Sequence, residues 1–289
     1  MASVLVTGAS RGIGLATSLA LGRAGHRVFA TMRHPVRAPE LEETAQAEDL
    51  PIRVSAMDVD SDDSVRAAVG AIQDEIGTLD ALVNNAGIER RGAIEELDLE
   101  AFRAVMETNY FGAVRCARAV LPRMRERGAG CIVNVTSVAG RIAVSPFAPY
   151  AASKFALEAL SEVLAQEVKP FGVRVAIVEP GIIDTGMARS IGQDSAASAY
   201  PHERRFAAMF AASLENPTPP SVVADRIREI IESDSWQLRH PVGPDAEPFL
   251  AWRAGMTDEE WVDWSAADDD AWFDAVERDF GLDARSDGA

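Results

Sequence analysis

One tyrosine and one lysine of this 289-residue chain stand at a spacing that can do acid–base chemistry. Tyr150 is one of three tyrosines, and Lys154 is one of only two lysines among the 28 Lys and Arg residues. Residues at i and i+4 share one face of a helix, so the phenol and the ammonium would point into the same space. A nearby ammonium favours phenolate and lowers the pKa of a tyrosine from about 10. The pair therefore predicts a proton donor or acceptor that works near neutral pH.

A hydroxyl stands upstream of this pair, because Ser137 ends an apolar run over 131–137. Taken alone, these residues fit equally well a surface tyrosine beside a lysine on a helix face. The N-terminus favours the chemical interpretation. An apolar run at 3–6 leads into three glycines, Gly8, Gly12 and Gly14, and then into a helical pattern. Glycines placed between a first strand and a first helix allow backbone N–H groups to approach a pyrophosphate, and they indicate a dinucleotide-binding site.

The residues after the second predicted strand select between NAD and NADP. An acid there accepts a hydrogen bond from the ribose 2′-hydroxyl, whereas a cation binds the 2′-phosphate. The strand over 27–31 runs into Met32, Arg33 and His34 without an acid, and Arg11 adds a second cation beside Ser10. Since arginine pairs with phosphate in a bidentate geometry, we expect a preference for NADP(H).

Strand-like and helix-like segments alternate along the chain. Continuous apolar strands separated by helices are typical of a parallel sheet covered on both faces. We expect a single doubly wound α/β domain of the Rossmann type, with a mainly parallel seven-stranded sheet and a C-terminal helical extension. Strands are predicted at 3–6, 27–31, 52–57, 80–84, 130–136, 172–179 and 236–242, and helices at 12–24, 39–48, 62–76, 99–127, 149–169 and 219–232.

Three parts of this domain, 1–289, are expected to differ in role. Residues 1–185 would form the cofactor-binding and catalytic core. The segment 186–218 lacks a clear period and follows a strand end, so it would be a mobile substrate lid or else a surface insertion. Residues 244–289 would form an acidic helical extension, in which a capping box from Thr257 to Glu260 begins one or two acidic helices. Its aromatic residues are expected to pack on the domain's own surface, or otherwise to contact another subunit.

Composition and charge exclude several classes of binding partner. The net charge of −17 argues against nucleic acid and anionic membranes. The acidic tail is interpreted as a solvated face rather than a binding site. No apolar run approaches the roughly 20 residues that span a bilayer, and no signal-peptide pattern occurs, so a cytoplasmic protein without a membrane partner is expected. Cys116 and Cys131 should be buried free thiols, and the four histidines lack ligand spacing, so no metal site is expected.

Together the motifs resemble those of the short-chain dehydrogenase/reductase family over residues 1–186. Residues 30–33 and 239–243 resemble the branch that includes 17β-hydroxysteroid and retinol dehydrogenases. The residues that carry the family resemblance are Thr7, Gly8, Gly12, Gly14, Asp58, Val59, Asn84, Asn85, Ala86, Gly87, Asn109, Ser137, Tyr150, Lys154, Pro180, Gly181 and Thr185.

The resemblance implies an NADP(H)-dependent oxidoreductase that transfers a hydride between nicotinamide and a ketone or secondary alcohol. Tyr150 would be the acid in reduction and the base in oxidation, Lys154 would lower its pKa and bind the nicotinamide ribose, and Ser137 would donate to the substrate oxygen. Asn109 would hold a water in a proton relay from Lys154. The cofactor would be bound by Gly8, Ser10, Arg11, Gly12, Ile13, Gly14, Arg33, Asp58, Val59, Asn85, Ala86, Gly87, Tyr150, Lys154, Pro180, Gly181, Ile183 and Thr185.

The substrate is expected to be a small molecule, a medium-sized hydrophobic ketone or secondary alcohol, because the residues near the motifs are mostly apolar. Two other interpretations are a non-catalytic NADP-binding sensor or scaffold on the same fold, and an epimerase or dehydratase, against which the glycine spacing argues. The resemblance also implies a homo-oligomer, a dimer or tetramer, formed through the helices over 99–127 and 149–169. The expected pocket residues are Val138, Ala139, Arg141, Phe147, Ile182, Met187 and the segment 200–210.

Overall fold

The computed structural model describes residues 1–193 and 198–285. Within these ranges the strands are β1 (Ser3–Thr7), β2 (Arg27–Met32), β3 (Ile52–Ala56), β4 (Ala81–Asn84), β5 (Gly130–Val135), β6 (Val173–Pro180) and β7 (Arg239–Val242). They form one seven-stranded sheet in the order β3-β2-β1-β4-β5-β6-β7, and every neighbouring pair is parallel. The predicted α/β class and parallel sheet are therefore confirmed, although β7 is shorter than the predicted 236–242.

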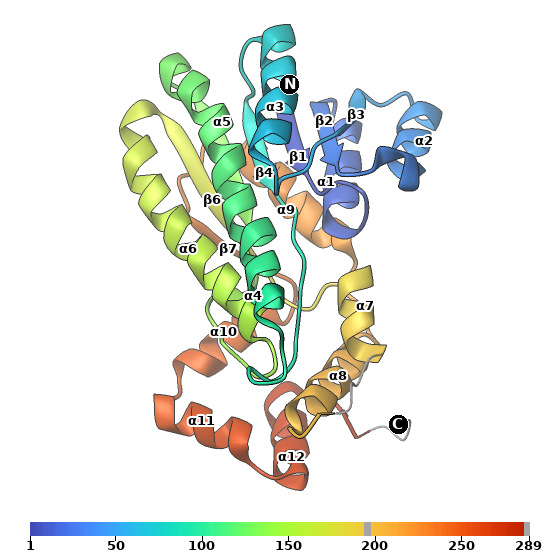
Figure 1. Cartoon of the computed structure of the whole chain (residues 1–289), viewed down its shortest axis with the longest axis vertical. Helices are drawn as coiled ribbons and strands as arrows, with labels where there is room; N and C mark the ends of the chain where they lie inside the picture. The colour runs from blue at the N-terminus through green and yellow to red at the C-terminus, as the bar shows by residue number, and fades with distance from the viewer. Residues whose placement is uncertain (194–197, 286–289) are drawn as a thin grey trace.

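Helices cover both faces of the sheet (Figure 1). In the described part of the chain they are α1 (Gly12–Arg23), α2 (Glu40–Ala47), α3 (Asp62–Ile76), α4 (Leu99–Met106), α5 (Gly112–Arg127), α6 (Ala148–Val168), α7 (Gly186–Gln193), α8 (His202–Ser213), α9 (Pro220–Glu232), α10 (Ala246–Ala254), α11 (Asp258–Ala266) and α12 (Asp269–Phe280). On one face α1 and α9 bury Leu21 and Ile227 against the strands. On the other face α3 and α5 bury Ile72 and Val120. Both long predicted helices lie on this second face.

A π-helical turn interrupts the helix predicted over 99–127. α4 ends at Met106 and α5 begins at Gly112, and the turn Glu107–Phe111 joins them. Single π-helical turns inside α-helices occur frequently at functional sites. Asn109 lies in this turn and is buried.

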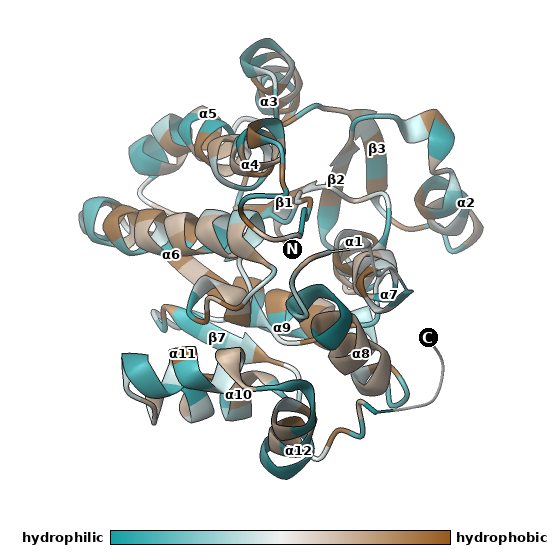
Figure 2. Cartoon of the chain, turned by 60° about the horizontal axis from the view of Figure 1, so that its bottom comes forward, coloured by the Kyte–Doolittle hydropathy of each residue, from teal (hydrophilic) through white to brown (hydrophobic). Residues whose placement is uncertain are grey.

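The chain after β6 contains more helix than its composition indicated. The predicted lid holds α7 and α8, with residues 194–197 outside the described part. The extension holds α10 as well as α11 and α12, and the last two match the one or two helices predicted from Thr257 onward. Thr257 and Glu260 form the predicted capping box at the start of α11. Figures 1 and 2 show α10, α11 and α12 gathered beside α8 at one end of the molecule, and α11 is largely hydrophilic.

Cys116 and Cys131 are buried free thiols, as expected. Among the helices of the described ranges, none is long and apolar enough to cross a membrane.

The order of the strands reverses at β1, which pairs with β2 on one side and β4 on the other. Loops that leave two such strands turn to opposite faces of the sheet and open a crevice at the carboxyl ends. β1, β4, β5 and β6 all end at this edge, where the sequence places the glycine turn, residues 85–87, Ser137 and Pro180. The topology therefore brings the separate motifs together.

Candidate active site

A cavity of about 1450 Å³ lies at this crevice, and we call it the crevice cavity. It is lined by the glycine turn, the segments after β2 to β6, and α7. Every residue predicted to bind the cofactor lines it except Gly14, and so does Ser137. Gly14 lies beneath the turn, where a Cβ would overlap the Gly8 carbonyl and the Asn85 amide. The lining is partly polar and partly apolar, as a dinucleotide requires.

The glycine turn is fixed to the end of β4 by hydrogen bonds. Asn85 Nδ2 donates to the carbonyl oxygens of Thr7 at 2.9 Å and Gly8 at 3.1 Å. Thr7 Oγ1 accepts from the backbone N–H groups of Asn85 and Ala86, both at 3.0 Å. Asn85 therefore braces the turn as well as lining the cavity. At the start of α1, the N-cap residue Arg11 makes no side-chain cap hydrogen bond, so the helix N-terminus can bind an anion.

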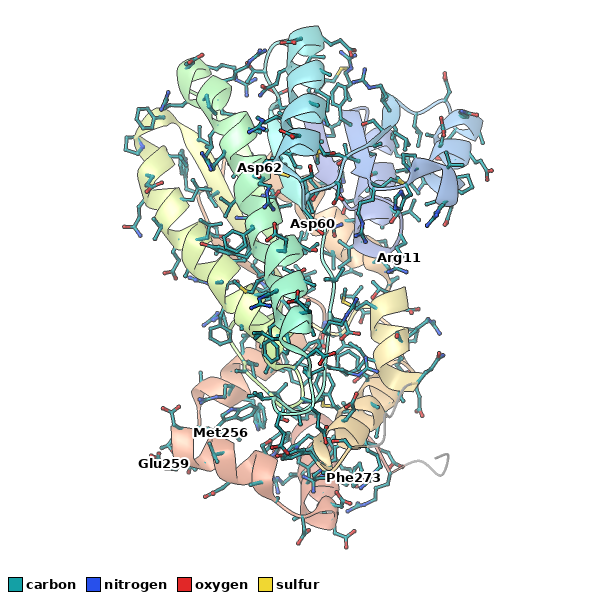
Figure 3. The ribbon with its side chains drawn as sticks, in the orientation of Figure 1. Arg11, Asp60, Asp62, Met256, Glu259 and Phe273 are labelled. Atoms are coloured by element: carbon teal, nitrogen blue, oxygen red, sulfur yellow. The ribbon has the colours of Figure 1, made fainter. Side chains whose placement is uncertain are left out.

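The outer end of the crevice cavity holds both predicted cations and an acid that sequence reasoning missed. Arg11, Arg33 and Asp60 all line the cavity, and Figure 3 shows Arg11 and Asp60 between the sheet and α7. Burial raises the pKa of Asp60, while a hydrogen bond from Thr108 and the charge of Arg33 oppose the rise. Asp60 Oδ1 is buried and accepts no protein hydrogen bond within the described residues. A polar ligand would satisfy this atom, so the residues present fit a nucleotide.

Asp58 and Val59 also line this end of the cavity. Asp58 Oδ1 accepts a hydrogen bond from the backbone N–H of Asp60 at 3.1 Å, and the Asp58 N–H donates to Ser64 Oγ at 2.9 Å. These bonds fix the loop after β3, which carries Asp60 towards Arg33.

Ser137, Tyr150 and Lys154 meet at the inner end of the crevice cavity. Ser137 follows β5, and its Oγ accepts from the Ala139 N–H at 3.1 Å and donates to Pro180 O at 3.4 Å. Tyr150 and Lys154 lie one turn apart on α6, with Lys154 Nζ 5.4 Å from the centre of the Tyr150 ring. Lys154 Nζ donates to Val135 O at 2.9 Å, which fixes α6 to the end of β5. The predicted hydroxyl, phenol and ammonium therefore share one site.

The expected lowering of the Tyr150 pKa is wrong for this structure. Burial raises the pKa of Tyr150 to about 12, the charge of Glu89 adds to the rise, and a hydrogen bond with Ser137 opposes it. The lysine lies against the ring and bonds to Val135, and burial lowers the pKa of Lys154 itself to about 8. Spacing alone predicted that the two groups would meet, but it could not show that loss of solvation would outweigh their attraction.

Asn109 lies behind the cavity wall rather than in its lining. Its side chain accepts from the Ile88 N–H at 2.8 Å and donates to Ile88 O at 2.9 Å and Ser153 Oγ at 2.9 Å. A Cβ at Gly87 would lie 3.4 Å from Asn109 Oδ1 and 3.8 Å from Lys154 Nζ. The π-helical turn therefore directs Asn109 to brace the loop after β4 against α6, close to the lysine.

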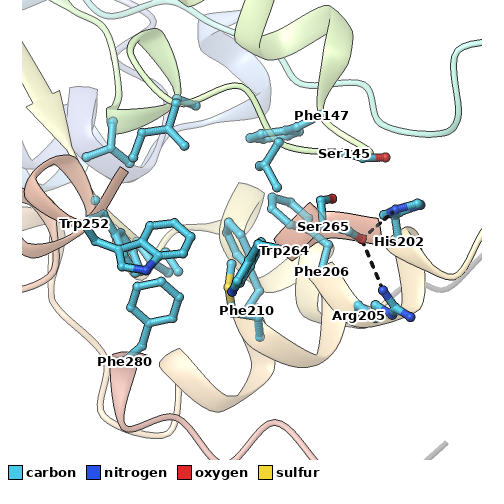
Figure 4. Close-up of a pocket in the computed structure, with 18 of the residues that line it drawn as sticks. Ser145, Phe147, His202, Arg205, Phe206, Phe210, Trp252, Trp264, Ser265 and Phe280 are labelled. Atoms are coloured by element: carbon cyan, nitrogen blue, oxygen red, sulfur yellow. Dashed lines mark hydrogen bonds between the residues drawn. The ribbon is translucent and has the colours of Figure 1, made fainter. Parts of the chain in front are cut away.

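A second cavity of about 810 Å³, the aromatic cavity, adjoins the first (Figure 4). The two share Ser137, Phe147, Gly181 and Phe210, so Ser137 stands at their junction. Trp252 packs edge-on against Trp264 with ring centres 4.9 Å apart. The aromatic side chains that line this cavity are Phe147, Phe206, Phe210, Phe249, Trp252, Trp261, Trp264, Trp272 and Phe280.

The acidic side chains of α11 and α12 are mostly exposed, as the predicted solvated face requires, whereas Asp245 is partly buried. The aromatic residues of the extension pack on the domain's own surface, as predicted, and they also line a cavity beside Ser137 that was not predicted. The predicted pocket residues Val138, Ala139, Phe147 and Ile182 do line the aromatic cavity, as do several residues of 200–210. Met187 lines the crevice cavity instead. Arg141 lines neither of these two cavities and lies 3.5 Å from Glu179.

A buried ionic group, absent from the predictions, ties the loop after β4 to α8. Arg91 Nη1 lies 3.0 Å from Glu89 Oε1, and Arg91 Nε lies 3.4 Å from Glu203 Oε1. All three side chains are at least 86% buried, since the most exposed of them, Glu89, is 14% exposed. This group anchors the described part of the predicted lid. No spacing rule could have found it, because Glu203 lies more than 100 residues after Glu89 and Arg91 in the chain.

Comparison with known proteins identifies the family of this chain. The family model for short chain dehydrogenases matches residues 2–196. An uncharacterised oxidoreductase of Bacillus subtilis is 34% identical over 91% of this chain and 95% of its own length. Retinol dehydrogenase 8 of Bos taurus is 41% identical over 69% of this chain and 64% of its own length, in keeping with the branch resemblance. A crystal structure of actinorhodin polyketide ketoreductase with NADPH has a TM-score of 0.75 and 31% identity, covering 85% of this chain and 97% of the other. This chain belongs to the short-chain dehydrogenase family and is an oxidoreductase of that family.

Proposed function

We propose that the protein is an NADP(H)-dependent reductase of hydrophobic ketones, with the secondary alcohol as the product. One observation carries the proposal: Ser137 stands where a cavity suited to a dinucleotide meets an aromatic cavity, and Tyr150 and Lys154 lie beside it. A substrate in the aromatic cavity would present its carbonyl to these groups, while its apolar body contacts aromatic rings.

The cofactor, when bound, supplies the hydride that reduces the carbonyl carbon. Tyr150 donates its phenolic proton to the carbonyl oxygen, and Ser137 donates a hydrogen bond that stabilises the negative charge developing there. With a pKa of about 12, Tyr150 is protonated at neutral pH and is ready to act as an acid. The Lys154 ammonium stabilises the phenolate left behind.

The remaining assignments are part of the same proposal. Arg11 and Arg33 would bind the 2′-phosphate, and Asp60, by partly neutralising Arg33, would make the preference for NADP less strict. Asn109 would hold the water of a proton relay to Lys154. The other residues predicted to bind the cofactor keep that role, Gly14 through its packing beneath the turn.

We further propose that two copies associate through α4, α5 and α6. These helices, together with the turn Glu107–Phe111 between α4 and α5, expose large apolar side chains that the monomer leaves in solvent, including Leu99, Phe111, Phe155 and Val163. Exposed apolar patches of this kind commonly mark subunit contacts. Light scattering on the purified protein would distinguish a monomer from a dimer or tetramer.

A panel of ketones tests the function, with NADPH oxidation followed by absorbance. Wild-type protein should reduce bulky apolar ketones, and Tyr150→Phe should lower turnover by about 10²–10⁴-fold, because general acid catalysis is lost. NADPH binding, followed by its fluorescence, should remain in the variant. If wild type binds NADPH but turns over no carbonyl, the protein is a sensor rather than a reductase. Unchanged turnover in Tyr150→Phe would refute the mechanism.

A further inference from the structure

We propose that Glu158 is a positioning residue of this reaction: its buried carboxylate fixes α6 against β5 and β7 and holds the Lys154 side chain in its ammonium form. The inference rests on the proposed function and assigns a role to a residue outside every motif described above. Glu158 follows Lys154 by four residues, as Lys154 follows Tyr150, so all three lie along one face of α6.

Both carboxylate oxygens of Glu158 face donors that come from the sheet. Thr136 Oγ1, adjacent to Ser137 at the end of β5, donates to Oε1 at 2.7 Å. Arg239 Nε, at the start of β7, donates to Oε2 at 3.0 Å. The Glu158 side chain is only 6% exposed. Hydrogen bonds to both oxygens, one of them from a guanidinium, stabilise the charged form of the carboxyl group.

Close packing fixes the carboxylate in this place. A Cβ at Gly140 would lie 3.0 Å from Glu158 Cγ and 3.2 Å from the Lys154 carbonyl oxygen. The short turn Val138–Gly140, directly after Ser137, therefore presses on the part of α6 between Lys154 and Glu158. The Glu158 side chain therefore adds to the bond of Lys154 to Val135 in joining α6 to the segment that leads to Ser137.

The charge of Glu158 acts on Lys154 in a buried environment. Burial lowers the pKa of Lys154 to about 8, and the negative charge of Glu158 opposes that shift. Without the carboxylate a larger fraction of Lys154 would be neutral near pH 8. A neutral amine stabilises a phenolate less than an ammonium does, so the proton transfer from Tyr150 would become less favourable.

The other charged groups around Glu158 do not reverse this effect. Arg239 also lies 3.8 Å from Glu179 Oε1 and pairs with Glu162, while Arg141 lies 3.5 Å from the same oxygen of Glu179. The pKa of Glu158 is raised, because burial outweighs the opposing effects of Thr136, Arg239 and Arg141. Burial and the charge of Glu158 both raise the pKa of Glu179. Replacing Glu158 with a neutral residue leaves Arg239 less well compensated, which disfavours the ammonium further.

Because the chain has only two lysines, the protonation of Lys154 can be measured directly by NMR, without an activity assay. Labelling with [¹³Cε]lysine gives one side-chain resonance for Lys154 and one for Lys169, and Lys169→Arg assigns them. We expect the Lys154 resonance to titrate near pH 8 in wild type and roughly one pH unit lower in Glu158→Gln, the effect of losing one nearby charge. Glu158→Gln keeps nearly the same volume and an oxygen that can accept from Thr136.

Glu162→Gln is the matched control. Glu162 pairs with the same Arg239, but its side chain is 50% exposed and acts on the guanidinium from the solvent side. The Lys154 titration should stay at the wild-type pH in this variant. If Glu158→Gln does not fold, Glu158→Asp can be used instead. Its side chain is one methylene shorter, so the carboxylate lies farther away and the Lys154 titration should move in the same direction by a smaller amount.

The pH profile of ketone reduction supplies the second readout. The alkaline decline should move with the NMR titration, so Glu158→Gln should lose about fivefold at pH 8, the loss that follows from a displacement of about one pH unit, and little at pH 6. An unchanged Lys154 titration in folded Glu158→Gln overturns the inference, whatever the activity. Absence of ketone reduction by wild type overturns the proposed function instead, so the two failures are distinguishable.

Discussion

Gly8→Ala tests how the glycine turn is held against the end of β4. Gly8 has a φ of 66°, a conformation that costs an alanine roughly 1 kcal/mol relative to glycine. A Cβ there would lie 2.7 Å from Ala86 Cα and 3.0 Å from Ala86 N. Because carbon atoms in contact normally lie about 3.5–4.0 Å apart, the turn must move by nearly 1 Å, at a cost of about 1–3 kcal/mol. The expected destabilisation is therefore about 2–4 kcal/mol.

Gly128→Ala separates the steric effect from the backbone effect. Gly128 has a φ of 74°, and nothing lies within 4 Å of the position of its Cβ. This variant should lose only about 1 kcal/mol of unfolding free energy and should bind NADPH like wild type. Gly8→Ala should also bind NADPH at least about tenfold more weakly, since loss of about 1.4 kcal/mol of phosphate contact is enough for that change.

Urea unfolding measures the two free energies, and NADPH fluorescence titration measures the two affinities. Equal destabilisation of Gly8→Ala and Gly128→Ala, together with equal NADPH affinity, would refute the close approach of the turn to Ala86. A change in stability without a change in affinity would show that the turn is structural only.

Three further predictions concern charge, protonation and the substrate wall. Arg33→Ala should weaken NADPH binding about tenfold and leave NADH binding unchanged. Arg37 does not line the crevice cavity, so Arg37→Ala should change the affinity for neither cofactor. If Arg33→Ala lowers the affinity for both cofactors equally, a contact with the 2′-phosphate is excluded. The rate of ketone reduction should fall as pH rises through about 8. Burial lowers the pKa of Lys154 to about 8, so its ammonium form is lost above that pH. A rate that stays constant to pH 10 contradicts a role of the Lys154 ammonium in the reaction. Trp252→Ala should lower kcat/KM about tenfold or more for bulky apolar ketones but not for acetone. Trp236 lies on the surface, so Trp236→Ala should alter neither value. If Trp252→Ala lowers kcat/KM equally for every ketone of the panel, the variant is misfolded instead.

The parts of the site that were predicted depend on short-range spacing and on the rule that parallel strands end at one edge. Tyr150 and Lys154 are neighbours on a helix, and the glycine turn follows a strand, so local sequence placed both. Asp60 was missed because its approach to Arg33 depends on β3 lying beside β2. The aromatic cavity was missed because Phe147 and Trp252 come together from segments about 100 residues apart. The direction of the Tyr150 pKa shift was missed because it depends on burial, and the distance between two residues in the sequence does not show how deeply they are buried.

The aromatic cavity draws six of its nine rings from residues 249–280, whereas the groups that would handle the hydride and the proton all lie before residue 190. Substitutions in the later segment can therefore change which molecules are accepted without disturbing the redox machinery. Such a division lets evolution diversify specificity while the chemistry stays fixed. It also suits laboratory chimeras, in which residues 244–285 are exchanged for the equivalent stretch of a relative.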